Sequence, residues 1–309
     1  MSIKISFVLS TRNRLSFLKL TLNILIKGLK PDEEIVVVDG NSSDGTPKYL
    51  EELFKAGKIH QYISEADRNQ AHGWNKAMLM ARGIIIKKII DDDVFDYHTI
   101  RKCADFMLAN PEIDVVISNE LNVSLSNCKQ IGKSSRLKQF IDWKHNKADS
   151  FTFSDVHLLI RKSALSYIGL YNTNLVMMDW EYALRISFLR ANIAYFTGYN
   201  ALSVGHEQSV SANKNIKLVH QQGEKVRLQY NYAGDAAEIS LWSKIKIYIG
   251  KILFSSNDKK ENLTAKIDIP ETYAYLYLKT EQINKNGVQE FITTWEQAEP
   301  LVKQKSLYY

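Results

Sequence analysis

The sequence predicts an α/β protein with a doubly wound, mostly parallel sheet covered by helices on both faces, followed by a mainly helical C-terminal region. Short runs rich in isoleucine and valine alternate with helical patterns through about residue 118, and glycines and prolines separate them. The chain has 309 residues, of which 45% are hydrophobic and 24% charged, so wholesale disorder is excluded. We expect a first domain over residues 1–212 and a second region over residues 213–309.

The first elements follow from apolar spacing and from turn residues. Residues 3–10 form the first expected strand, and leucines at three- and four-residue spacing then predict a helix that ends before Pro31. The dense apolar run 34–38 predicts a strand that is buried on both faces. In the next helix Thr46 is the expected N-cap and Pro47 the first helical residue, and Gly57 lies just past the end.

The same reasoning predicts the rest of the alternation and loses strength after residue 118. Residues 119–150 are polar and basic with little periodicity, which predicts a long loop or excursion. The remaining expected elements are strands at 58–63, 84–90, 113–118, 151–160 and 192–197, and helices at 71–82, 98–109, 161–168 and 179–191.

Two segments of the C-terminal region leave alternatives open. Residues 240–254 combine apolar bulk with lysines, which is compatible with a helix on an anionic membrane or with one packed on the first domain. Tyr273, Tyr275 and Tyr277 are compatible with an alternating strand or with one face of a helix.

Charge and cysteine content bound the compartment and the partners. The only cysteines are Cys103 and Cys128, there is no signal-peptide pattern, and no apolar run is long enough to span a bilayer. We therefore expect a cytoplasmic protein, with peripheral contact at the inner membrane left open. The net charge of +6 is compatible with nucleotide phosphates or an acidic membrane. Nucleic acid is not expected as a partner, because the basic residues are scattered.

Polar residues follow three of the expected strands, at the edge where an open parallel sheet binds ligands. They are the basic and hydroxyl segment 10–14, the acidic glycine-rich turn 39–45 and the acid triplet 91–93. Taken one at a time, these segments are also compatible with a turn, a helix cap and a solvated loop. Two like charges about 4 Å apart repel by about 4 kcal/mol at an effective dielectric of about 20, and a divalent cation removes that cost. Oxygen ligands favour Mg²⁺ or Mn²⁺, which are commonly held together with substrate phosphates.

At these positions the sequence resembles a family 2 glycosyltransferase with the GT-A fold, from about residue 3 to about residue 210. The resemblance rests on Val8-Leu9-Ser10-Thr11-Arg12-Asn13-Arg14, on Val36-Val37-Val38-Asp39-Gly40-Asn41-Ser42-Ser43-Asp44-Gly45-Thr46, on Ser64-Glu65-Ala66-Asp67-Arg68, on Asp91-Asp92-Asp93 at the position of the DxD motif, and on Met178-Asp179-Trp180-Glu181.

The resemblance implies roles for individual residues. The nucleotide of an activated sugar would be bound by Thr11, Arg12, Asp39, Arg68, Asp91 and Asp92. The metal ion, Mn²⁺ or Mg²⁺, would be held by Asp91 and Asp93, and His206 is either a further ligand or a surface-loop histidine. The catalytic base would be Asp179; Glu181 stays an alternative, because Met178 stands where the family has a carboxylate before its base.

The function that the resemblance implies is that of an inverting, metal-dependent glycosyltransferase. It would move a sugar from a nucleotide-diphosphate donor, expected to be a UDP-sugar, to a hydroxyl of a glycan or lipid-linked acceptor, in bacterial surface polysaccharide synthesis. A nucleotidyltransferase is one alternative, although residues 10–14 lack the glycine- and lysine-rich loop that such an enzyme would need. The other alternative is a non-catalytic nucleotide- or carbohydrate-binding protein on the same scaffold.

Overall fold

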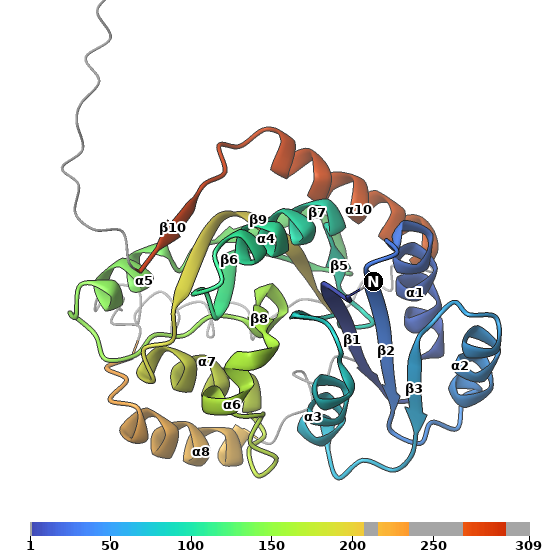
Figure 1. Cartoon of the computed structure of the whole chain (residues 1–309), viewed down its shortest axis with the longest axis horizontal. Helices are drawn as coiled ribbons and strands as arrows, with labels where there is room; N and C mark the ends of the chain where they lie inside the picture. Colours follow the sequence, from blue (N-terminus) through green and yellow to red (C-terminus); the bar gives the residue numbers. More distant parts are fainter. Residues whose placement is uncertain (1, 207–215, 235–267, 295–309) are drawn as a thin grey trace, which may run out of the picture.

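A single mixed sheet forms the centre of the protein in the computed structural model, which describes residues 2–206, 216–234 and 268–294. The strand order is β10-β9-β6-β8-β4-β1-β2-β3; β5 pairs with β9 and β7 with β6 (Figure 1). The strands are β1 (Ile5–Thr11), β2 (Glu33–Asp39), β3 (Gln61–Ser64), β4 (Ile85–Lys88), β5 (Val94–Phe95), β6 (Val115–Ser124), β7 (Asn127–Ser134), β8 (Leu159–Arg161), β9 (Ile193–Gly205) and β10 (Phe291–Thr293).

Helices cover both faces of this sheet. Figure 1 shows α4 and α10 on one side and α3, α6, α7 and α8 on the other. The helices are α1 (Leu15–Gly28), α2 (Thr46–Lys55), α3 (Gln70–Met80), α4 (Tyr97–Ala109), α5 (Leu137–Lys144), α6 (Leu165–Ile168), α7 (Met178–Phe188), α8 (Ile216–Gln229) and α10 (Ile269–Lys285), with 3₁₀ turns η1 (Asp155–His157) and η2 (Lys162–Ala164).

The two cores follow from the alternation of side chains along the buried strands. In β1, Val8 packs with α3 on one face, whereas Phe7 and Leu9 pack with α1 and α4 on the other. The parallel pairing of β3, β2, β1 and β4 is the expected doubly wound part. Strand β8 runs antiparallel between β4 and β6, so the second half of the sheet is mixed.

Helix α2 illustrates how local residues set a boundary. It begins at Thr46, and Gly45, with a φ of +91°, holds the cap position that we expected for Thr46. The Asp44 carboxylate, one residue before the cap, accepts hydrogen bonds from the Thr46 amide and hydroxyl, so it satisfies the first amide of the helix. Gly57, with a φ of +65°, lies just past the end of the helix, as predicted.

The prediction for residues 119–150 as one long loop is wrong. Strand β6 continues to Ser124 and forms a hairpin with β7, and helix α5 follows. The predicted strand 151–160 is also wrong over most of its length, because only residues from Leu159 onward join the sheet. Phe151 is anchored by hydrogen bonds with the Ser187 hydroxyl instead of by a neighbouring strand.

The described C-terminal residues return to the central sheet. The tyrosines 273, 275 and 277 lie in helix α10, which resolves the strand-or-helix alternative. Strand β10 extends the sheet by antiparallel pairing with β9. The amphipathic segment 240–254 lies outside the described residues, and the division at residue 212 stays a prediction.

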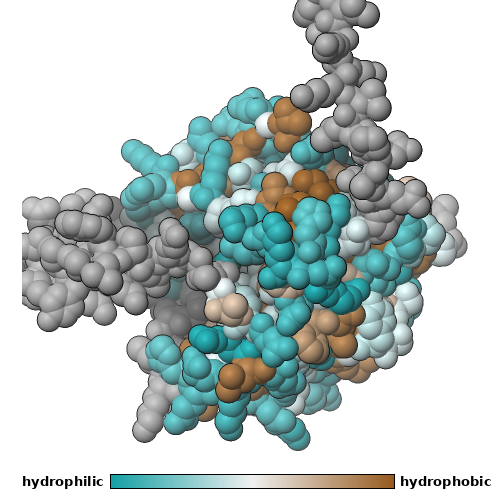
Figure 2. All heavy atoms as spheres, turned by 90° about the vertical axis from the view of Figure 1, so that its left-hand side faces the viewer, coloured by the Kyte–Doolittle hydropathy of each residue, from teal (hydrophilic) through white to brown (hydrophobic). Residues whose placement is uncertain are grey.

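The exposed large apolar side chains of the described residues come from several different helices and loops. The face seen in Figure 2 is mostly hydrophilic where its atoms are coloured. Isolated exposed side chains such as Leu228 and Val288 are normal for a folded chain. Among the described helices, none is both long and apolar enough to cross a bilayer.

Candidate active site

The first two predicted polar segments and the acid triplet meet at one edge of the sheet. The Thr11 hydroxyl, at the end of β1, donates to Asp91 Oδ2 at 2.6 Å. The Asn13 amide donates to Ser42 Oγ at 2.7 Å, which joins the first segment to the turn after β2. The parallel register, which pairs Thr11 with Asp39, places these strand ends at the same level. The predicted convergence is therefore confirmed.

The three carboxylates of the triplet are buried, with 3–5% of each residue exposed. Burial, with a further contribution from the neighbouring Asp92, raises the pKa of Asp91 to about 6 and that of Asp93 well above its ordinary value. Arg14 offsets part of this cost, because its guanidinium pairs with Asp91 at 3.1 Å and also with Asp92. The sequence reasoning did not single out Arg14, although it lies in the basic segment that follows β1.

Asp92 is the acid that contacts His206. The distance between Asp92 Oδ2 and His206 Nε2 is 2.7 Å, and only 10% of the His206 side chain is exposed, so it faces the triplet rather than solvent. The His206 ring stacks on Phe17 with 4.9 Å between ring centroids. From α10, the Tyr273 hydroxyl donates to the backbone oxygen of Asp92 at 2.5 Å.

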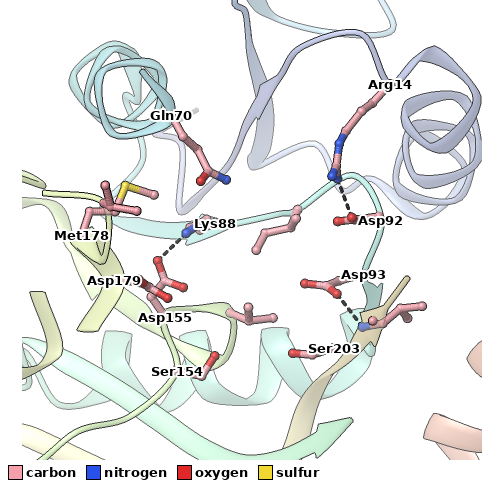
Figure 3. Close-up of a pocket in the computed structure, with 15 residues that line it drawn as sticks. Arg14, Gln70, Lys88, Asp92, Asp93, Ser154, Asp155, Met178, Asp179 and Ser203 are labelled. Atoms are coloured by element: carbon pink, nitrogen blue, oxygen red, sulfur yellow. Dashed lines mark hydrogen bonds and ion pairs between the residues drawn. The ribbon is translucent and has the colours of Figure 1, made fainter. Parts of the chain in front are cut away.

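Two adjoining hollows open beside the triplet. The first, which we call the inner hollow, has a volume of about 250 Å³ and is shown in Figure 3. The second, the outer hollow, also has a volume of about 250 Å³ and lies between the end of β1 and the start of α3. Both are lined by Arg14, Gln70 and Ile90, so they adjoin. The outer hollow is completed by Ser10, Thr11, Arg12, Asp67, Asn69 and Asp91.

Two residues that we expected to bind the nucleotide do not line either hollow. Asp39 is fully buried, and its two oxygens accept hydrogen bonds from Ser42 and Ser64, so it orders the turn after β2. The Arg68 side chain is exposed, whereas the neighbouring Asp67 lines the outer hollow and pairs with Lys76 at 2.6 Å. Roles for Asp39 and Arg68 in binding stay predictions.

Asp179 and Glu181, the two alternatives for the base, occupy different environments. Asp179 lies in the first turn of α7 and lines the inner hollow, and within the described residues its carboxylate has no hydrogen bond or ion pair. Glu181 is buried, pairs with Arg185 at 2.8 Å and accepts a hydrogen bond from the Tyr230 hydroxyl at 2.6 Å. Asp179 is thus available to a substrate, and Glu181 is engaged within the protein.

The wall opposite the triplet contains residues that the sequence reasoning missed. Lys88, at the end of β4, forms an ion pair with Asp155 of η1, and both line the inner hollow with Ser154 (Figure 3). The two lysines of this strand were visible in the sequence as an interruption of an apolar run. The partner of Lys88, Asp155, lies 67 positions away and was not visible there.

The acids and the histidine beside the inner hollow are compatible with a divalent ion that is bound together with a substrate. No three histidine, cysteine or acidic side chains form a ready metal cage in the part of the chain that the structure describes. Asp92 and His206 do meet, and Asp93 lines the same hollow with a carboxylate whose charge burial disfavours. Ions such as Mg²⁺ use one or two carboxylates together with substrate phosphates, so this donor set is compatible with an ion that arrives with its substrate.

Comparison with known proteins decides the family. The model of Glycosyl transferase family 2 matches residues 6–169, more than half of the chain. The chain belongs to glycosyl transferase family 2. The match includes β1, the turn after β2, the triplet and the Lys88–Asp155 pair, and it ends before Asp179 and His206.

A curated protein and several solved structures are also similar to this chain. A poly-beta-1,6-N-acetyl-D-glucosamine synthase of Staphylococcus epidermidis is 24% identical over 198 residues, which are 62% of this chain and 47% of that protein. The chain thus spans about half the length of the curated relatives it matches.

Among solved structures, S. aureus TarS 1-349 in complex with UDP-GlcNAc has a TM-score of 0.56 at 17% identity over 91% of this chain and 82% of that one. The mannosyltransferase PcManGT from Pyrobaculum calidifontis, in complex with GDP-Man and Mn²⁺, has a TM-score of 0.51 at 15% identity over 90% and 88%. These similarities show that this family 2 chain has the GT-A fold.

Proposed function

We propose that this chain is an inverting, metal-dependent glycosyltransferase. It moves a sugar from a nucleotide-diphosphate donor, a UDP-sugar, to a hydroxyl of a glycan or lipid-linked acceptor. The observation that carries the proposal is the Asp179 carboxylate, which has no partner among the described residues and lies across the inner hollow from Asp92 and Asp93 (Figure 3).

The donor would lie across both hollows. The outer hollow, at the start of α3, suits the nucleoside and diphosphate, because a helix N-terminus and Arg12 and Arg14 favour negative charge. The inner hollow then receives the sugar, whose anomeric carbon faces the side of Asp179. Similar folds with UDP-GlcNAc and with GDP-Man in their structures support a nucleotide-sugar donor.

Asp179 would act as the general base. A sugar hydroxyl is a poor nucleophile, and a positioned carboxylate that accepts its proton contributes about 10²–10⁴-fold to the rate. The acceptor oxygen attacks the anomeric carbon as the bond to the diphosphate breaks, so a single displacement inverts that carbon. Arg14, which lines both hollows, would stabilise the negative charge that the leaving diphosphate gains.

Asp92, His206 and Asp93 are the residues that would hold a divalent ion, Mn²⁺ or Mg²⁺. When bound, such an ion stabilises the departing diphosphate as a Lewis acid. Asp91, which Thr11 and Arg14 engage, would instead support the nucleotide side. A relative named for the synthesis of a polysaccharide supports a role in bacterial surface polysaccharide synthesis.

The test compares Asp179→Asn with Glu181→Gln and the wild-type chain. Release of UDP or GDP from nucleotide sugars is measured with Mn²⁺ and a panel of glycan and lipid-linked acceptors, and donor binding is measured by calorimetry. We expect Asp179→Asn to lower turnover by at least about 100-fold with unchanged donor affinity. Proton NMR of the product should show the inverted anomeric configuration.

Four outcomes would contradict the proposal. Equal turnover in Asp179→Asn and wild type would remove the base assignment, and a retained anomeric configuration would remove inversion. Donor binding without turnover by the wild-type chain would favour the non-catalytic alternative. Release of pyrophosphate from a nucleoside triphosphate would favour a nucleotidyltransferase.

A further inference from the structure

The ion pair between Lys88 and Asp155 is an unusual feature of the inner hollow. Lys88 is the last residue of β4, a strand otherwise buried in the sheet, and it is 7% exposed; Asp155 is 3% exposed. The Lys88 ammonium also lies over the ring of Trp74, 4.4 Å from its centroid. Asp155 Oδ2 accepts from Lys88 and, at 2.8 Å, from the Tyr171 hydroxyl.

Stability alone is a weak reason for such a pair. Replacing a buried ion pair by apolar residues of similar volume is often neutral or stabilising, because removing two charges from water costs about as much as their attraction returns. A parallel strand in this position ordinarily consists of apolar residues. A role of the pair in the hollow gives a stronger reason for its presence.

The pair leaves one carboxylate oxygen without a hydrogen bond. Asp155 Oδ2 is engaged by Lys88 and Tyr171, whereas Oδ1 accepts no hydrogen bond from the described residues, and Asp155 lines the inner hollow. Asp155 and Asp179 line the same wall (Figure 3). Burial raises the pKa of the Tyr171 hydroxyl, and these two carboxylates raise it further, which places both near that tyrosine.

The charges of the hollow select between classes of sugar. Four carboxylates and two cations line it. Both cations are paired with lining acids, Lys88 with Asp155 and Arg14 with Asp92. Carboxylate oxygens are acceptors for sugar hydroxyls. A metal ion held by Asp92 and Asp93 would offset those two acids, but a carboxylate on the sugar would still meet the like charges of Asp155 and Asp179.

We propose that Asp155, held in place by Lys88 and Tyr171, accepts a hydrogen bond from a hydroxyl of the donor sugar and makes the inner hollow a site for neutral sugars that rejects uronic acids. This inference rests on the proposed function and adds the class of sugar to it. Asp155 is thus a specificity-determining residue, and Lys88 is a positioning residue that acts through it.

The test uses two donors that differ only at one carbon. UDP-glucose and UDP-glucuronic acid are titrated into the full chain by calorimetry with Mn²⁺, beside UDP alone; GDP, GDP-mannose and GDP-mannuronic acid form the parallel set. We expect the neutral sugar nucleotide to bind at least about 10-fold more tightly than the uronic acid. In Asp155→Asn the ratio of the two affinities should fall several-fold. The neutral sugar nucleotide should also lose several-fold of its affinity advantage over the free nucleotide. The affinity for the free nucleotide itself should not change.

Two further variants separate the loss of Asp155 from other effects of substitution. Asp142→Asn removes the acid of an exposed lysine–aspartate pair on α5 and serves as the matched control. Because Asp155→Asn leaves the buried Lys88 ammonium without its carboxylate, the double variant Lys88→Met, Asp155→Leu removes both charges and should lose the discrimination as well.

Equal binding of the neutral sugar and the uronic acid by the wild-type chain would overturn this inference alone. The inference would also be overturned if Asp155→Asn and the double variant both discriminated between the two sugars as strongly as Asp142→Asn does. Failure of both UDP and GDP, and of their sugars, to bind would overturn the proposed function and this inference with it.

Discussion

His157, in the 3₁₀ turn that carries Asp155, should make the stability of the fold depend on pH. Its ring is 1% exposed, and burial, with a smaller contribution from Lys87, lowers its pKa to about 3. In the unfolded chain the ring has its ordinary pKa of about 6.5. The folded state therefore loses no stability through this ring well above pH 6.5, where the ring is neutral in both states. It loses stability progressively as the pH falls below 6.5, because only the unfolded chain takes up the proton.

The size of the effect follows from the two pKa values. At pH 5 the unfolded ring is almost fully protonated and the folded ring almost fully neutral, 1.5 pH units below the unfolded pKa. At about 1.4 kcal/mol for each unit, His157 lowers the free energy of unfolding by about 2 kcal/mol between pH 7.5 and pH 5.

Urea denaturation followed by tryptophan fluorescence at both pH values measures this effect. Other groups also titrate in this range, so the comparison is with His157→Gln, which lacks the ionisable ring. The wild-type chain should lose about 2 kcal/mol more than His157→Gln on going from pH 7.5 to pH 5. An equal loss in both proteins would refute the reasoning, because it would mean that the buried ring takes up its proton without cost.

Three other substitutions test the geometry of the site. In Gly73→Ala the added Cβ would lie 2.3 Å from Ser10 Oγ and 2.5 Å from Asp67 Oδ2, so KM for the donor should rise about 10-fold, whereas Gly28→Ala, with open space around its Cβ, should leave KM unchanged. Glu181→Gln should cost about 3 kcal/mol in urea denaturation because it breaks the buried pair with Arg185, but the folded fraction should keep its turnover; a loss of turnover as large as that in Asp179→Asn would contradict the assignment of the base. Tyr273→Phe should cost about 1–2 kcal/mol and weaken Mn²⁺ binding several-fold by calorimetry, since it removes the hydrogen bond to the Asp92 backbone, and unchanged Mn²⁺ affinity would separate α10 from the proposed metal site.

The parallel part of the fold could be predicted from sequence because its signals are local. Each of these elements is predicted by residues only a few positions apart. The signals are the apolar runs of β1 and β2, the leucine stripe of α1 and the turn residues around α2. The convergence of Thr11 with Asp91 followed from one rule about the carboxyl ends of parallel strands.

The parts that failed lack such local signals. Strand β7 is mostly exposed along its length, so its polar residues carry no alternation that a strand prediction could detect. The segment around Phe151 and Phe153 has buried aromatic residues but takes its hydrogen bonds from Ser187 on α7. Its irregular path depends on tertiary contacts, which the sequence does not display.

In the candidate site, too, local features could be predicted from the sequence and long-range pairs could not. The acid triplet and Asp179 were visible as residue types at strand and helix ends. Two ion pairs of the site were not visible: Arg14 lies 78 positions from Asp92, and Lys88 lies 67 positions from Asp155. Charge compensation across such separations is a property of the folded sheet, and for this reason the sequence reasoning, which invoked a divalent ion to relieve the repulsion among these acids, did not identify Arg14 as a partner of Asp91 and Asp92.

The hydrogen bond from Tyr273 to Asp92 spans 181 positions of the chain. During synthesis, the acid-bearing loop therefore stays incomplete until helix α10 has left the ribosome, and β10 can join the sheet only after that. A nascent chain that has already formed its parallel strands still exposes the edge of β9, and it must wait for these later residues before the carboxylates acquire their final surroundings.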